Sequence, residues 1–284
     1  MSEWKVEISG FADEIASDLN QQIALLQDLD MHYLEMRGVN GRFLVEYTLE
    51  EAAEIKKNLD AAGIRLSSVG SPIGKIRITD DFEPHFELFR HTVELAHLME
   101  TPNIRMFSFF MPQGEDPARY HDEVMRRLDR MAQYAAQHNV VLLHENEKEI
   151  YGDIAPRCLE IMQEFYSDSF KAVFDFANFV QCGQDTWEAW EMMRPYVSYV
   201  HIKDALFATG GVVPAGEGDG QVKRILGELK KQGYQGFLSL EPHLAEFDGF
   251  AALEYGGSIQ NSGTPREYAF RIAHKALMRI LADL

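Results

Sequence analysis

Eight short apolar runs, each of strand-like length, alternate along this chain with stretches of helical periodicity. The runs lie near residues 5–9, 32–36, 64–70, 103–108, 140–145, 171–175, 197–203 and 236–241, at intervals of about 26–40 residues. Such alternation predicts a parallel sheet whose strands are joined by helical crossovers. An open doubly wound sheet usually has about five or six strands. Eight units therefore favour an α/β fold made of one closed (β/α)8 barrel, the TIM barrel.

Signals for helix ends agree with this division of the chain. Thr48 is a candidate N-cap residue, and Glu51 three positions later completes a capping box. Gly63 and Gly233 stand where helices are expected to stop before the next strand. No linker rich in Pro, Gly or Ser divides the chain, and 284 residues with 46% hydrophobic content can bury one large core. We therefore predict a single domain over residues 1–284.

The connection over residues 242–262 is unusually long and rich in glycine and aromatic side chains. Long loops of this kind often act as lids or interface elements, which we expect here. A disordered surface loop is the alternative, and its aromatic residues Phe247, Phe250 and Tyr255 count against that reading.

Charge and cysteine content exclude several classes of function. The formal net charge of −18 argues against nucleic acid and anionic membranes as partners, and it weakly disfavours a highly phosphorylated substrate. Two cysteines, Cys158 and Cys182, are too few for a disulfide scaffold. The N-terminus lacks the apolar stretch of a signal peptide, and no segment reaches the length of a membrane span. We expect a soluble protein of the cytoplasm.

Four of the apolar runs end at or near one potential metal ligand: Glu145, Asp175, His201 and Glu241. A carboxylate at the end of a buried strand is costly to desolvate unless a positive charge meets it. In this barrel type the active site lies at the carboxyl ends of the strands, where these four residues would lie together. Three carboxylates and one imidazole suit a single Mn²⁺ or Mg²⁺, with Co²⁺ or Zn²⁺ as alternatives. A structural zinc site, in contrast, prefers thiolates.

Each of these residues also has an ordinary structural interpretation. A single Glu after an apolar strand is more often a salt-bridge partner at the barrel rim, and a single His at a strand end is usually a hydrogen-bonded structural residue. Four such residues in consecutive strand–helix units are better explained by one cation, and four protein ligands leave room for substrate oxygens.

Five segments around these positions together resemble the sugar phosphate isomerase/epimerase family, the xylose-isomerase-like TIM barrel group that also includes endonuclease IV. They are His144-Glu145-Asn146-Glu147, Phe174-Asp175-Phe176-Ala177-Asn178, His201-Ile202-Lys203-Asp204, Gly216-Glu217-Gly218-Asp219 and Leu240-Glu241-Pro242-His243. The family's metal ligands map onto the same four residues. In its ketose 3-epimerases the first and last glutamates are also the acid/base pair, which implies that role for Glu145 and Glu241. Relatives are commonly homodimers or homotetramers.

The resemblance and the ligand set predict a metal-dependent isomerase or epimerase of a keto-sugar or sugar phosphate. A proton next to the carbonyl would be removed, and a metal-stabilised cis-enediolate would form. A dehydratase of a keto-cyclitol or of dehydroshikimate is the first alternative, because it begins with the same proton abstraction. A non-catalytic sugar-binding barrel is the second. DNA repair on the endonuclease IV pattern is disfavoured, because the second, third and fourth strands end without histidine.

Five further residues are candidates for substrate binding: Lys203, Asn178, His243, Glu217 and Arg105. Lys203 lies two residues beyond His201 and so points to the same face, although a rim salt bridge with Asp204 or Glu217 is equally compatible. Asn178 stands where the epimerases often have His, which leaves the substrate open. His243 lines the pocket, packs against a helix or faces solvent. Arg105 and Lys75 are candidate anchors for a polar or phosphorylated tail. The stretch Gly216–Gly220 suggests a phosphate cradle by position, but its two carboxylates favour a substrate-shaping turn.

Overall fold

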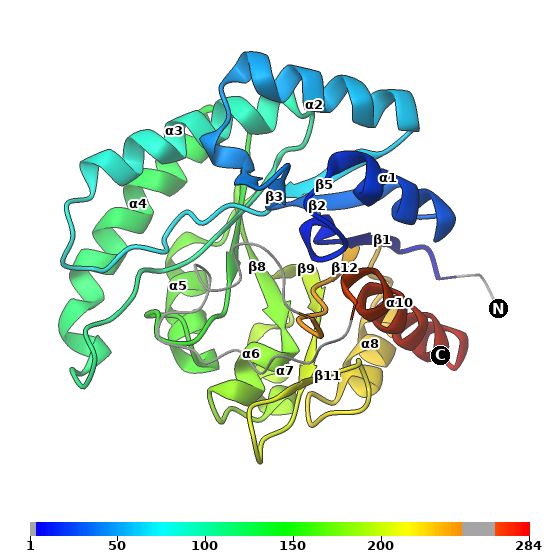
Figure 1. Ribbon diagram of the computed structural model, residues 1–284. Coiled ribbons are helices and arrows are strands. Elements are labelled where there is room, and N and C mark those ends of the chain that lie inside the picture. The colour runs from blue at the N-terminus through cyan, green and yellow to red at the C-terminus, as the bar shows by residue number, and fades with distance from the viewer. Residues whose placement is uncertain (1–3, 246–264) are drawn as a thin grey trace.

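A barrel of eight parallel strands, surrounded by helices, is formed by the residues that the structure describes, 4–245 and 265–284 of a computed structural model (Figure 1). The strands follow the order β1-β12-β9-β8-β7-β6-β5-β2 around the sheet. A parallel bridge between Phe11 and Glu35 joins the two edges of this sheet, so that the barrel is nearly closed. The predicted TIM barrel is confirmed, and each of the eight predicted runs overlaps one of its strands. That residues 1–284 form one domain stays a prediction.

The barrel strands are β1 Glu7–Gly10, β2 Tyr33–Met36, β5 Arg65–Val69, β6 Asn103–Met106, β7 Val141–Glu145, β8 Phe170–Asp175, β9 Val197–Ile202 and β12 Phe237–Leu240. The α-helices are α1 Leu19–Asp28, α2 Leu49–Ala62, α3 Glu83–Leu98, α4 His121–Gln137, α5 Ala155–Phe165, α6 Phe176–Gln181, α7 Thr186–Met193, α8 Val222–Lys231 and α10 Arg266–Ala282. Short 3-10 helices are η1 Ala12–Glu14, η2 Leu44–Glu46 and η3 Pro117–Tyr120. Two small hairpins pair β3 Gly38–Val39 with β4 Arg42–Phe43, and β10 Asp204–Ala205 with β11 Val212–Val213.

The predicted start and end of α2 are confirmed in detail. The Thr48 hydroxyl accepts a hydrogen bond from the N–H of Glu51 at 3.2 Å, and the Glu51 carboxylate accepts one from the N–H of Thr48 at 2.9 Å. Gly63 follows the helix with φ of 72°, the left-handed conformation that glycine adopts without strain. The chain is then free to turn into β5.

Inside the barrel, an apolar layer lies before the carboxyl ends of three strands. It consists of Leu143, Val173 and Tyr199, which pack together and are buried. Each stands two residues before Glu145, Asp175 or His201, so strand alternation directs each pair to the same face. Apolar side chains thus fill the barrel interior at this level, and the ionisable groups lie beyond them at the carboxyl ends of the strands.

Most of the connection over residues 242–262 lies outside the described residues, which resume at position 265. Its predicted role as a lid or interface element is therefore not tested. Among the described helices, none is both long and apolar enough to cross a membrane.

Candidate metal centre

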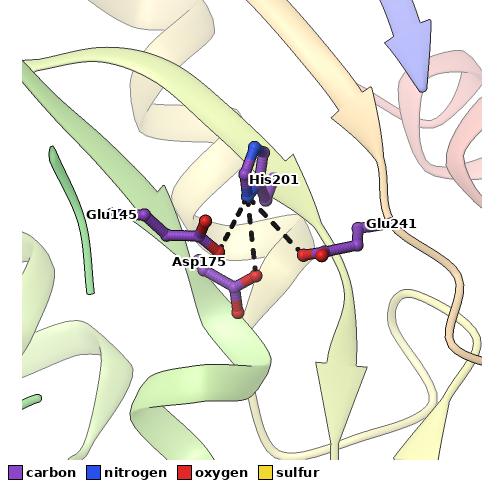
Figure 2. Close-up of side chains that lie close together, drawn as sticks. All are labelled: Glu145, Asp175, His201 and Glu241. Atoms are coloured by element: carbon purple, nitrogen blue, oxygen red, sulfur yellow. Dashed lines mark hydrogen bonds and ion pairs between the residues drawn. The ribbon is translucent and has the colours of Figure 1, made fainter. Parts of the chain in front are cut away.

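The four predicted metal ligands converge at the carboxyl ends of neighbouring strands (Figure 2). Glu145 and Asp175 end β7 and β8, His201 lies near the end of β9, and Glu241 directly follows β12. One ligand atom from each residue lies within 4.8 Å of those of the others, and all four residues are buried. From Nδ1 of His201, the nearest carboxylate oxygens of Glu145, Glu241 and Asp175 lie at 3.0, 3.6 and 3.9 Å.

His201 is held in this orientation by a carboxylate on the opposite side of its ring. Its Nε2 lies 3.1 Å from the Glu35 carboxylate on β2, and the hydroxyl of Ser239 donates to the same oxygen at 2.8 Å. Burial opposes protonation of the imidazole, yet Glu145 and Glu35 raise the pKa of His201 well above its usual value. Nδ1 is the nitrogen left facing the other three ligands. Glu35 was not predicted as a site residue, although a carboxylate inside the apolar run Tyr33–Met36 carries the same signal as the four predicted ligands.

Asp175 has a buried carboxylate oxygen that accepts no hydrogen bond. Its Oδ1 accepts the N–H of Asn178 at 2.7 Å and so caps α6. Its Oδ2 is buried without a hydrogen-bond partner, although Nζ of Lys203 lies 3.2 Å away. Burial raises the pKa of Asp175 to about 8, and Lys203 opposes this shift only in part. A buried carboxylate oxygen that faces an imidazole nitrogen and two glutamates fits the first coordination sphere of a hard divalent cation.

Four of the five predicted substrate-binding residues contact the predicted ligands directly: Lys203, Arg105, Asn178 and His243. Nζ of Lys203 lies 2.9 Å from Oε2 of Glu241, so Lys203 pairs with the ligands instead of the rim residues Asp204 or Glu217. Arg105 approaches Glu145 and Glu241 with Nη1 at 3.3 and 3.8 Å.

The side chain of Asn178 donates to Oε1 of Glu145 at 3.2 Å. Burial acts against ionisation of Glu241, but Lys203 and His243 hold its pKa well below the usual value. Glu241 is therefore ionised at neutral pH.

A second ion-pair network, which sequence analysis missed, borders the ligands on the side of β1 and β2. Arg37 after β2 donates to Asp13 at 2.8 and 3.1 Å, to Glu14 at 3.2 Å and to Glu241 at 3.3 Å. His243 joins it, since Nε2 lies 3.4 Å from Glu14 and 3.3 Å from Glu241. Asp13 and Glu14 lie shortly after the first strand, and Arg37 directly follows the second. Their position after strand ends was the sequence feature that could have predicted their place near the site.

Glu217, the fifth predicted substrate-binding residue, is exposed, and within the described part of the chain it makes no contact with the ligands. Its role stays a prediction. The glycine-rich loop around it is arranged about Asp204 instead. The Asp204 carboxylate accepts the N–H groups of Gly216, Gly218 and Gly220 at 2.9, 3.1 and 2.8 Å.

Comparison with known proteins agrees with this architecture. The family model described as "Xylose isomerase-like TIM barrel" matches residues 23–262. This chain belongs to that family. A 3-dehydroshikimate dehydratase of Bacillus anthracis is 24% identical over 190 residues, which cover 64% of this chain and 66%, just under two thirds, of that enzyme.

Two solved structures show the same fold. D-allulose 3-epimerase from Methylomonas sp. has a TM-score of 0.74 at 15% identity, covering 97% of this chain and 96% of its own. A xylose isomerase-like TIM barrel protein from Mycobacterium smegmatis, solved in complex with magnesium, has a TM-score of 0.65 at 17% identity, covering 98% and 100%. This chain therefore has the fold of an enzyme family and a buried group of side chains that can hold a metal ion.

Proposed function

We propose that this protein is a divalent-metal-dependent isomerase or epimerase that acts on a keto-sugar or a sugar phosphate. The observation that carries the proposal is the convergence of Glu145, Asp175, His201 and Glu241, among which one buried oxygen of Asp175 accepts no hydrogen bond. These four residues would hold Mn²⁺ or Mg²⁺, with Co²⁺ or Zn²⁺ as alternatives. A sugar is the small-molecule partner in this proposal. A homodimer or homotetramer and a cytoplasmic location stay predictions.

A bound cation would polarise the substrate carbonyl and stabilise the negative charge that develops when the neighbouring C–H is broken. The chain's own residues carry the proton steps. Glu241, kept ionised by Lys203, is suited to remove the proton and hold it as a carboxylic acid. Glu145, from the strand on the other side of the group, would enter the cycle protonated and deliver that proton from the opposite face, and proton exchange with water would restore both carboxyl groups. Delivery to the same carbon inverts its configuration. Delivery to the former carbonyl carbon, with transfer of the hydroxyl proton to the former carbonyl oxygen, moves the carbonyl.

Lys203, Arg105 and Asn178 would support this exchange without changing their own protonation. Lys203 and Arg105 lie against the two glutamates, and their fixed positive charges stabilise the ionised form of these buried carboxyl groups. Asn178 donates to Glu145 and so restricts the direction in which that carboxylate points.

A metal-dependent dehydratase is the second candidate, and the similarity to the 3-dehydroshikimate dehydratase supports it. The first step would be the same proton abstraction. The electron pair would then expel the β-hydroxyl group, which leaves as water after taking up a proton. The ligand set suits both reactions, because both need the same stabilised anion.

Incubation of the Mn²⁺-loaded protein in D₂O with ketoses, ketose phosphates, an inosose and 3-dehydroshikimate distinguishes the candidates. An isomerase or epimerase incorporates deuterium next to the carbonyl and yields a new sugar by NMR. A dehydratase instead produces the absorbance of a conjugated product. A protein that exchanges no proton with any of these ketones contradicts both proposals and indicates a non-catalytic sugar-binding barrel.

A further inference from the structure

The cationic side chains around the proposed metal centre are all engaged by acceptors of the chain itself. Arg37 pairs with Asp13, Glu14 and Glu241. Arg105 pairs with Glu145 and also donates to the carbonyl oxygens of Gly70 and Ser71 at 3.2 and 3.4 Å. The bonds to carbonyl groups hold its guanidinium in place, and its Nε is buried and has no hydrogen-bond partner among the described residues.

The two lysines of the site are engaged in the same way. Lys203 lies between Asp175 and Glu241, at 3.2 and 2.9 Å. Lys75 lies 3.2 Å from Glu147, and its side chain is only 7% exposed. Lys148, which follows Glu147, is not free either. Every buried cation that borders the centre in the described part of the chain thus already has a partner.

Acidic groups outnumber the cations of this network. Seven carboxyl groups, Asp13, Glu14, Glu35, Glu145, Glu147, Asp175 and Glu241, meet four cations, Arg37, Lys75, Arg105 and Lys203. Lys148 is a fifth cation, because its charge helps to lower the pKa of Glu147. With a metal ion bound, the carboxyl groups ionised and the histidines neutral, a divalent cation balances the two negative charges that remain. The site then holds no surplus of positive charge that would attract a negatively charged ligand.

The usual phosphate position of such barrels is also occupied from within. Phosphate groups often bind to backbone N–H groups in the loops after the last strands. Here the loop after β9 directs the N–H groups of Gly216, Gly218 and Gly220 at the carboxylate of Asp204. A Cβ atom on Gly218 or Gly220 would lie 2.4 or 2.6 Å from Oδ1 of Asp204, so the glycines permit this close approach. A carboxylate of the chain therefore takes the place that a phosphate group would have at these three N–H groups.

The sequence of the segment that the structure does not describe adds no cation. Residues 246–264 contain no Lys or Arg, and they include the acidic residues Glu246, Asp248 and Glu254. Nothing in the composition of this segment would neutralise a substrate phosphate or carboxylate.

From these observations we infer that the substrate is uncharged: a neutral polyhydroxy ketone and not a phosphate ester or a carboxylate. This inference rests on the proposed function and narrows it. It favours a free keto-sugar or a keto-cyclitol as the substrate. It disfavours substrates such as dehydroshikimate, which is an anion at neutral pH. The polar groups of the site would meet hydroxyl groups, which both accept and donate hydrogen bonds.

Matched pairs of ketones test the inference. The Mn²⁺-loaded protein is incubated in D₂O with hexuloses and their 6-phosphates, and with an inosose and 3-dehydroshikimate. We expect the neutral member of each pair to exchange deuterium. The kcat/KM for exchange with the charged member should be at least about 100-fold lower than that with the neutral member. Faster exchange with a phosphate or carboxylate overturns the inference and leaves the proposed function intact. Exchange with none of the ketones overturns the proposed function, and the inference with it.

Binding of inorganic phosphate gives a readout that does not depend on activity. Asp204→Ala exposes the three glycine N–H groups, whereas Asp219→Ala removes a carboxylate of the same loop that accepts only the N–H of Phe207. We expect Asp204→Ala to bind phosphate by calorimetry and the wild-type protein and Asp219→Ala not to. Binding of phosphate by the wild-type protein overturns the inference, and this result can be read even where Asp204→Ala does not fold.

Discussion

The His201 ring has carboxylates on both of its nitrogens. The predicted metal ligands face Nδ1, and Glu35, which is not one of them, faces Nε2. Glu35 contacts Nε2, on the side of the ring opposite to Glu145, Asp175 and Glu241. A histidine that ligates a metal usually donates its other N–H to such a partner, which fixes both tautomer and orientation. Glu35 is therefore a positioning residue for the proposed ion.

We expect Glu35→Ala to weaken Mn²⁺ binding by about 10- to 100-fold while the protein stays folded. The imidazole would lose the acceptor that keeps Nδ1 directed at the cation. Titration of the apo protein with Mn²⁺, followed by electron paramagnetic resonance, measures the change. Glu87→Ala, on the exposed face of α3, is the control. A Glu35→Ala protein with wild-type affinity would contradict the positioning role.

The two glutamates of the proposed acid/base pair require a different test, because they are also proposed metal ligands. Glu145→Gln and Glu241→Gln preserve shape and one acceptor oxygen but remove the exchangeable proton. We expect each to lower kcat by at least about 100-fold, which is a typical contribution of general acid–base catalysis. The circular dichroism spectrum should remain that of the wild type. Near-normal turnover by either variant, measured with saturating Mn²⁺, refutes the assignment of two bases.

At the scale of elements, the connection from β5 to α3 depends on a neutral histidine. His85, in the first turn of α3, accepts the N–H of Gly74 at 2.7 Å through Nε2. Gly74 has φ of 92°, and a Cβ there would lie 2.0 Å from the carbonyl oxygen of Phe107. Burial, with a smaller effect of Arg127, lowers the pKa of His85 to about 4. Protonation would replace this acceptor with a donor.

The unfolded chain therefore binds a proton at this histidine below about pH 6.5, whereas the folded chain binds it only below about pH 4. The stabilisation is present above pH 6.5, and about 3 kcal/mol of it is lost as the pH falls through this window. Urea unfolding at a series of pH values measures the slope. His85→Gln keeps an acceptor that does not titrate, so its slope should be shallower. His32→Gln, at an exposed position directly before β2, is the control, and equal slopes for all three proteins contradict the prediction.

Elements were more predictable from sequence than the contacts between them. Strand runs and the capping box of Thr48 depend on neighbouring residues, so a local pattern reveals them. The four ligands followed from one rule, that strand ends in a barrel meet at one face. Arg37 was missed because its pairing with Glu241 joins residues 204 positions apart and depends on barrel closure. Asp204 was missed because the partners of its carboxylate are backbone N–H groups, which every residue but proline carries.

For the whole molecule, the apolar core and the ionic site occupy different places. The main core lies between the sheet and the surrounding helices, as with Leu26, Phe89, Leu128 and Leu277, all buried. The ligands stand at one end of the barrel, above the small layer that includes Tyr199. Burial of this core supplies the driving force for folding, so the metal is not needed to form the barrel. Excess negative charge at the site opposes folding in the apo protein, and the cation would remove part of that opposition.

Removal of the metal should therefore leave a folded but less stable and inactive protein. At a free Mn²⁺ concentration 100 times the dissociation constant, the gain in stability is about 2.7 kcal/mol, which for a chain of this size corresponds to a rise in Tm of a few degrees. Calorimetry of chelator-treated protein before and after addition of Mn²⁺ measures the rise, and the proton-exchange assay follows recovery of activity. Asp175→Asn, which weakens the site, should show a smaller rise. If removal of the metal by a chelator unfolds the protein, the apolar core is not sufficient to hold the strands together. The ion would then be a structural part of the barrel.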